Sequence, residues 1–286
     1  MAIPANYSDF SKDLNDLLNK DFPLGFSKLE INQTTSNGIK VTVNNVKNST
    51  TGAIASDLKT KYSDKANGLT VTSTYHASNV LTAQVELQDL ISHGFKLDIH
   101  GSLHPSLGTT SAKAGLELQQ ANVFARSSID LLAKSGATIH TDVVVGSEGL
   151  LLGGDVAYNS GDSSIHRYNV AVGYKTPEYT LGFHATKKFT HFAAGYFHNI
   201  HKGLQVGTRA TWDQAANSEV GIEIGSKCAL GKDAFVKTKI NNVGVLGLGY
   251  TQILRPGVKV SLGGSIHTTR LHENVHKVGV HFVFDN

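Results

Sequence analysis

Cysteine, proline and charge are all scarce in this sequence. It has one cysteine and five prolines in 286 residues, and charged residues make up 17% of the chain, whereas about 25% is usual in a soluble domain. The single cysteine, Cys228, excludes an internal disulfide and a metal site built from cysteines. No hydrophobic run approaches the roughly 18 residues that a transmembrane helix requires, which excludes a helical membrane span.

Two further classes are disfavoured by what the sequence lacks. The first residues, MAIPANYSDF, have neither the basic nor the apolar segment of a secretory signal, and they do not form an arginine-rich presequence. The net charge of +3 is too small a basic bias for a nucleic-acid-binding protein. We therefore expect no secretory route and no nucleic-acid partner.

An amphipathic helix is predicted at the start of the chain. Apolar residues recur there at helical spacing on one face, while charged and amide residues fill the other face. Ser8 can cap this helix, which we expect to cover residues 8–20, and Pro23 and Gly25 end it and form a hinge. The residues of the apolar face are Tyr7, Phe10, Leu14, Leu17 and Leu18.

From Gly25 onward the period changes from 3.6 to 2. Apolar and polar residues alternate in segments of about ten residues, separated by short clusters rich in Gly, Asn and Ser. Such segments are strands with one apolar and one polar face, and we count about nineteen of them. The alternation is clearest in residues 81–88, 95–103, 204–212 and 258–265.

Strand length separates a membrane barrel from a soluble sandwich. Strands of about ten residues are long enough to cross a bilayer at a tilt, whereas sandwich strands are usually about 5–6 residues long. A sheet in lipid must close on itself, and a closed barrel this wide leaves a water-filled lumen. We therefore predict an all-β transmembrane barrel in residues 26–286, preceded by a helix and hinge in residues 1–25.

Three stretches of the chain are distinctive: residues 7–9 together with 15–22, residues 239–258 and residues 276–284. They resemble the mitochondrial porins, the voltage-dependent anion channels, and are most similar to fungal members. The resemblance covers the whole chain and implies nineteen strands, with the first and last paired in parallel, and a helix folded inside the pore. It also implies a position in the mitochondrial outer membrane.

One departure concerns Ser73. In many animal members a membrane-facing glutamate follows the strand segment that corresponds to residues 68–72, and here that position holds serine. We expect any regulation that depends on this carboxylate to be absent or replaced.

Basic residues are the candidate functional residues of such a channel. In a pore they would attract anions and give a weak anion preference, and the resemblance implicates Lys12 and Lys20 in nucleotide passage. Acidic residues such as Glu86, Asp98 and Glu223 offset them. The alternative is a solvated polar lining with no role in selectivity. The candidates are Lys12, Lys20, Lys96, Arg126, Lys237 and Lys239.

Two weaker site predictions rest on the resemblance alone. Weak dinucleotide contact is implied around Val245, Gly247, Gly263 and Ile266. The last strand resembles the sorting signal of mitochondrial β-barrels, which predicts the barrel-assembly machinery as a partner and Lys277, Gly279, Phe282 and Phe284 as the signal.

No catalytic or metal-binding arrangement is predicted. The pair His198 and His201 would point to opposite faces of a strand, so they cannot share a metal. We expect a channel without enzymatic activity or cofactor, with the lipid bilayer and permeating nucleotides and anions as partners, and a second copy of the chain as a further candidate.

Three functions stay open at this point. The first is a voltage-gated, weakly anion-selective diffusion channel for small hydrophilic metabolites. The second is a protein-import pore of the same barrel superfamily, although such pores usually carry long additional N-terminal segments. The third is a soluble ligand-binding β-barrel.

Overall fold

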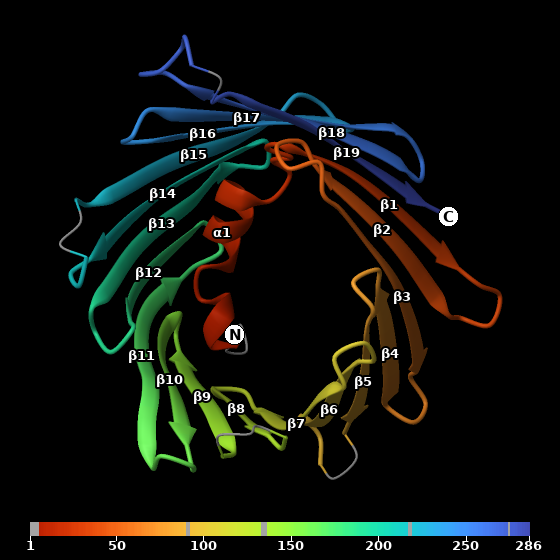
Figure 1. Cartoon of the computed structure of the whole chain (residues 1–286). Coiled ribbons are helices and arrows are strands. Elements are labelled where there is room, and N and C mark those ends of the chain that lie inside the picture. Colours follow the sequence, from red (N-terminus) through yellow and green to blue (C-terminus); the bar gives the residue numbers. More distant parts are fainter. Residues whose placement is uncertain (1–5, 90–91, 133–135, 217–218, 274) are drawn as a thin grey trace.

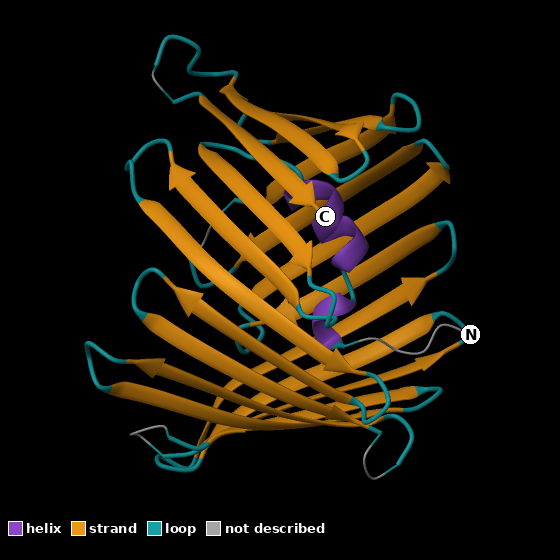
Figure 2. Cartoon of the chain, turned by 90° about the vertical axis from the view of Figure 1, so that its right-hand side faces the viewer, coloured by secondary structure: helices purple, strands orange, loops and turns teal. Residues whose placement is uncertain are grey.

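The computed structural model describes residues 6–89, 92–132, 136–216, 219–273 and 275–286, and in them nineteen strands form one sheet that closes into a barrel (Figure 1). The N-terminal helical segment lies inside the barrel, and the strands are tilted in side view (Figure 2). The strands are β1 Phe26–Thr34, β2 Lys40–Asn48, β3 Ile54–Asp64, β4 Leu69–His76, β5 Val80–Gln88, β6 Phe95–His104, β7 Thr109–Gln119, β8 Val123–Asp130, β9 Thr138–Ser147, β10 Leu150–Asn159, β11 Ser164–Lys175, β12 Tyr179–Thr186, β13 His191–His201, β14 Leu204–Asp213, β15 Gly221–Ala229, β16 Ala234–Asn241, β17 Val245–Arg255, β18 Val258–His267 and β19 Lys277–Asp285.

The barrel is closed by a parallel pair, as predicted. Strand β1 runs parallel to β19 from Ser27 opposite Val280 to Asn32 opposite Asp285, and the other neighbouring strands are antiparallel. The Asn32 side-chain amide donates a 2.7 Å hydrogen bond to the Asp285 carboxylate across this seam. Closure pairs the edge strands, whose backbone groups would otherwise stay unpaired in lipid.

The predicted alternation sets the two faces of the wall. On β6, Ile99 is 49% exposed on the outside, whereas the neighbouring Asp98 is 7% exposed on the lumen side. Outward aromatic rings gather at two levels of β11–β14. One group stacks Phe183, Phe192 and Trp212, and the other joins Tyr174, Tyr179 and Tyr196. This pattern fits an apolar lipid-facing band bordered by aromatic residues.

The N-terminal helix differs from its prediction in one respect. It is split into a 3₁₀ turn, η1 Tyr7–Asp9, and a helix, α1 Lys12–Asn19, instead of one helix over residues 8–20. Ser8 is not the cap, because the Asn6 side chain accepts a hydrogen bond from the Ser8 backbone N–H. Ser11 precedes α1, but its hydroxyl hydrogen-bonds to Nε2 of His184 on β12 at 2.7 Å. The wall therefore takes up the side chain that would otherwise cap the helix.

No helix in the described ranges is long and apolar enough to cross a membrane.

Candidate functional site

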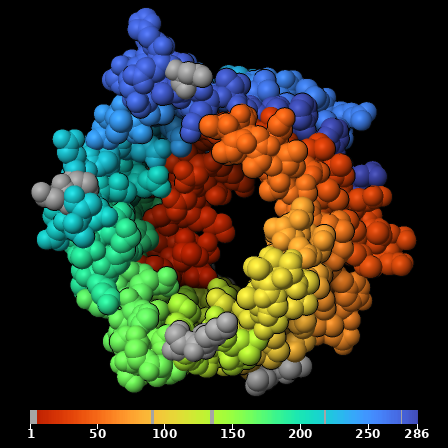
Figure 3. Space-filling model, viewed as in Figure 1, coloured from red at the N-terminus to blue at the C-terminus, as the bar shows by residue number. Residues whose placement is uncertain are grey.

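An open passage runs through the barrel and is narrowed on one side by the N-terminal segment (Figure 3). The segment packs its apolar face on the inner wall, where Phe10, Leu14, Leu17 and Leu18 are at most 5% exposed. The polar face is turned to the lumen, where the Lys12 and Lys20 side chains are 62% and 65% exposed. The N-terminal segment therefore lines one side of the passage, and the inner faces of the strands line the rest.

A row of lumen-facing glycines receives this apolar face. A methyl group added at Gly195 on β13 would lie 2.5 Å from Cδ2 of Leu14, and one at Gly207 on β14 would lie 2.6 Å from Cδ1 of Leu14. A methyl group at Gly225 on β15 would lie 2.6 Å from Cδ2 of Leu18. Real Cβ atoms essentially never lie so close to a neighbour, so a side chain at any of these three positions would force the leucine or the helix to shift.

The row continues along the path of the segment, and we call it the glycine track. Its members are lumen-facing and several lie directly opposite one another in the sheet, as Gly173, Gly182 and Gly195 do on β11–β13. Phe10 lies against the start of the track, while Phe22 and Pro23 lie against its end. The track consists of Gly153, Gly173, Gly182, Gly195, Gly207, Gly225, Gly249, Gly263 and Gly279.

Lys237 on β16 ties the C-terminal end of α1 to the wall. Its side chain is 4% exposed, and its ammonium donates hydrogen bonds to the backbone carbonyls of Asp16 at 2.7 Å and Lys20 at 3.0 Å. The same ammonium lies 3.6 Å from the Asp21 carboxylate. A cation is favourable at this point because the last carbonyls of a helix carry partial negative charge.

A charged chain beside Lys237 connects the middle of α1 to the same wall. Arg209 on β14 donates to the side-chain oxygen of Asn15 at 3.2 Å and to Glu223 at 2.5 Å. Glu223 also lies 3.1 Å from the ammonium of Lys239, which is 5.1 Å from the centre of the Phe22 ring. The wall therefore holds the middle of the helix through the Asn15 amide.

The predicted basic residues occupy three kinds of environment. Lys12 and Lys20 lie on the lumen face of the helix, 3.5 Å from Asp9 and 3.9 Å from Asp16. Two others lie on the strand wall beside carboxylates, Lys96 on β6 at 3.0 Å from Glu86 and Arg126 on β8 at 4.0 Å from Asp98. Lys237 and Lys239 lie at the helix. The structure therefore does not gather the six into one ring.

The four predicted dinucleotide-contact residues are only partly brought together. Val245 and Gly247 line a cavity of about 590 Å³ at one mouth, together with Lys239, Arg270 and Lys277. Gly263 instead lies under Pro23, and Ile266 faces outward with 37% of its surface exposed.

The predicted sorting-signal residues lie on both faces of β19. Phe282 and Phe284 are outward-facing and partly exposed, at 38% and 37%. Lys277 and Gly279 face the lumen, where the side chain of Lys277 lies against Gly25 and Gly279 lies against Pro23.

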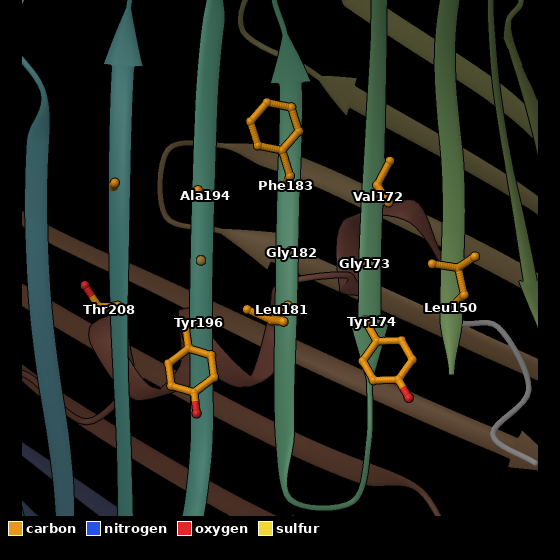
Figure 4. Close-up of a pocket in the computed structure, with 12 residues that line it drawn as sticks. Leu150, Val172, Gly173, Tyr174, Leu181, Gly182, Phe183, Ala194, Tyr196 and Thr208 are labelled. Carbon is orange, nitrogen blue, oxygen red and sulfur yellow. The ribbon is translucent and has the colours of Figure 1, made fainter. Parts of the chain in front are cut away.

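The outer surface behind the glycine track is hollowed. An apolar groove of about 480 Å³ runs across β10–β14, and Figure 4 shows Leu150, Val172, Leu181 and Phe183 beside it, with the rings of Tyr174 and Tyr196 near one end. Gly173, Gly182 and Gly195 line this groove from the outside and touch the N-terminal segment from the inside. The wall between helix and exterior is a single backbone layer here.

Ser73 lies on the outer face of β4, between the outward-facing Val71 and Tyr75. The serine therefore stands at a lipid-facing position.

Among the described residues, no three His, Cys, Asp or Glu side chains are arranged to hold a metal ion.

The glycine track was not predicted from the sequence. The available signal was the recurrence of glycine at polar-face positions of consecutive strands, as at Gly207 between Gln205 and Arg209. An alternation pattern treats such a glycine as neutral, so its role becomes visible only when the helix is placed against it.

Comparison with known proteins gives one consistent result. The family described as "Eukaryotic porin" matches residues 3–279. The mitochondrial outer membrane protein porin of Neurospora crassa is 37% identical over 289 residues, covering 100% of both chains, and that of Candida albicans is 39% identical over 282 residues, covering 98% of this chain and 99% of the other. Human "Non-selective voltage-gated ion channel VDAC1" is 30% identical over 286 residues, covering 99% of each chain.

Solved structures support the fold alone. A mutant of Rh. blastica porin matches with a TM-score of 0.51 at 13% identity, covering 90% of this chain and 97% of that one. At this identity the match speaks for a porin-like barrel and for nothing finer.

Proposed function

Because this chain belongs to the eukaryotic porin family, we propose that it forms a voltage-gated, weakly anion-selective channel through which small hydrophilic metabolites diffuse across the mitochondrial outer membrane. The observation that carries the proposal is the open passage through a closed, lipid-facing barrel (Figure 3). Full-length similarity to two fungal outer-membrane porins supports the location.

Anion preference is the finer part of the proposal. The animal relatives are named non-selective channels. A preference of this channel for anions over cations would depend on the charges that its own lumen carries. Several lumen lysines are compensated by carboxylates, as Lys96 is by Glu86. The net excess of +3 over the whole chain is small, which favours a weak preference.

The test is the reversal potential of the refolded channel in a planar bilayer under a salt gradient. We expect a small anion preference for the natural chain. Replacing Lys12, Lys20 and Lys96 with glutamate changes the lumen charge by about six elementary charges and should move the reversal potential towards cations. A matched control replaces Lys47, Lys65 and Lys188, which lie at strand ends and turns at the two mouths and not in the narrow part. An equal shift in both triple variants would contradict a role for the inner residues.

Voltage gating requires charge that moves in the membrane field. Each elementary charge that crosses the full field contributes about 2.3 kcal/mol per 100 mV, so a few charges moving part-way suffice. The helix is a candidate carrier, with Lys12 and Lys20 on its lumen face and Gly25 behind it as a hinge with φ of 77°. Tethering Phe10→Cys to Gly173→Cys, in a Cys228→Ser background, tests this. Unchanged closure after tethering would assign gating to the wall.

Two partners are part of the proposal. The barrel-assembly machinery would read the end of β19, and replacing Phe282 and Phe284 with serine should slow assembly in isolated mitochondria, whereas replacing Val278 and Val280 should not. A second copy of the chain would meet the outer surface of the barrel, which native-size measurements in nanodiscs can detect. The import-pore alternative has less support, because the fungal relatives that match over their full length are named porins.

A further inference from the structure

A second lumen cavity lies at the mouth of the barrel formed by the β13–β14, β15–β16 and β17–β18 turns. It has a volume of about 200 Å³, and its lining includes Lys202, Lys227, Lys232 and Lys259. Phe235 and Ile253 provide an apolar floor. We call it the lysine cavity.

Charge in the lysine cavity is poorly compensated. Among the described residues, no carboxylate lies within 4 Å of the ammonium of Lys202, Lys227 or Lys232, and Lys259 shares Asp21 with Lys237 at 3.5 Å. One carboxylate in the lining, Asp233, stands against four lysines. Other lumen lysines of the wall lie beside a carboxylate, as Lys28 does with Glu30, Lys96 with Glu86 and Lys113 with Asp130.

Strand register increases the repulsion. Lys227 on β15 is directly opposite Lys237 on β16, and both face the lumen. Like charges at paired positions destabilise a sheet. Lys237 is engaged with the carbonyls of the helix, while the Lys227 ammonium rests 4.4 Å from the centre of the Phe235 ring. An anion in the cavity would relieve this repulsion.

We propose that the lysine cavity is a docking site for phosphate-bearing anions at one mouth of the pore. The proposal rests on the proposed channel function and adds a place where such anions bind before or after passage. The cavity is smaller than the roughly 300 Å³ at which pockets for whole drug-sized ligands begin, so it fits a phosphate or diphosphate group and not an entire nucleotide. Lys227 and Lys259 project from the lumen face, so the ligand is a soluble anion and not a lipid headgroup.

The test is a titration of the refolded chain with inorganic pyrophosphate in nanodiscs of zwitterionic lipid, followed by the amide resonances of residues 231–235. Saturable shifts are expected for the natural chain. The double variant Lys227→Gln/Lys232→Gln should bind roughly fivefold more weakly, because exposed charges contribute modestly. Lys227→Arg/Lys232→Arg should retain binding. The matched control Lys47→Gln/Lys188→Gln removes two lysines near the other mouth and should leave the affinity unchanged.

The outcomes separate this site from the channel function. Non-saturating shifts, or equal weakening in both glutamine variants, would overturn the site. The same shifts on adding anionic lipid without pyrophosphate would overturn the choice of a soluble anion. The reversal potential of the natural chain is measured in parallel. A channel that prefers anions but does not bind pyrophosphate refutes the site alone, whereas the absence of any conductance refutes the proposed function.

Discussion

Two regions of the barrel wall differ in the side chains that they present to the lumen. On β10–β19 the inward positions nearest the N-terminal segment are glycines, as at Gly195, Gly207 and Gly225. On β4–β6 the inward positions hold polar side chains such as Thr72 and Gln84, and the helix α1 packs on β13–β15 instead. Both regions obey the same alternation. The inward glycines of β13–β15 therefore leave room for α1 on that side of the barrel.

Polar contacts differ in the same way. On β4–β8 several inward side chains pair with neighbours in the wall, as in the 2.7 Å hydrogen bond between Ser102 and Ser111 and the Lys96–Glu86 pair. The helix-bearing wall directs Arg209 and Lys237 to the helix. The helix α1 packs on β13–β15, whereas β8 meets the N-terminal segment through Phe124, which is buried with Phe10. Variants that weaken the contacts between α1 and the wall should therefore release the helix, and the hydrogen exchange of its amides measures this release.

The largest effect is expected from Leu18→Ala. Leu18 is fully buried against Gly225, and emptying such a site costs about 2–5 kcal/mol. Because the loss falls on helix docking, the α1 amides should exchange hydrogen at least about thirtyfold faster, while the exchange of strand amides stays unchanged. An equal acceleration in β4–β6 would mean that the helix and the wall unfold together.

The next effect comes from filling the glycine track. Gly207→Val adds atoms where a methyl group would already lie 2.6 Å from Leu14 and 2.9 Å from Leu17, and overpacking of this kind costs about 1–3 kcal/mol. We expect faster exchange of α1 amides and higher protease sensitivity of residues 7–20. A control on the outer face of the wall is Gly101→Val on β6, where the nearest atom lies 4.0 Å away. If this control releases the helix equally, the glycines on β13–β15 are not its specific seat.

Lys237→Met should have an intermediate effect. It removes both hydrogen bonds to the end of α1 and keeps most of the buried stem. Because lumen water can reach the two carbonyls once the ammonium is gone, we expect a net loss of about 1 kcal/mol. The Asp21 carboxylate still has the ammonium of Lys259 at 3.5 Å. We therefore expect faster hydrogen exchange in residues 16–20 and little change in the rest of the N-terminal segment. Lys237→Arg should restore part of the protection. Protection that survives in the methionine variant would show that packing alone holds the helix.

The smallest effect is expected on the exposed face of the helix. Lys12→Gln breaks a 3.5 Å pair with Asp9 whose lysine side chain is 62% exposed, and such pairs contribute about 0–1 kcal/mol. Hydrogen exchange of α1 should change by less than about fivefold. A change as large as that of Leu18→Ala would show that the lumen face also holds the helix.

Local sequence patterns are sufficient to predict most of the barrel. Alternation over residues 81–88 and 95–103 predicts the inward and outward faces of β5 and β6, because neighbouring side chains of a strand point to opposite sides whatever the strand pairs with. Helical spacing predicts the buried face that holds Leu14 and Leu18 for the same reason. The break between η1 and α1 is not predictable in this way, since it depends on the hydrogen bond of Ser11 to His184, 173 residues away.

For the residues of the candidate site, too, some properties follow from the local sequence and others from tertiary contacts. The sequence by itself determined that Lys12, Lys96 and Lys237 stand on polar faces, since face follows from position along a helix or strand. Only the tertiary structure decided that Lys96 meets Glu86, that Lys237 is buried at the end of α1, and that Lys227 meets no carboxylate among the described residues. These differences arise from which strands become neighbours and where the helix comes to rest. Both depend on contacts between residues far apart in the chain, which no local pattern contains.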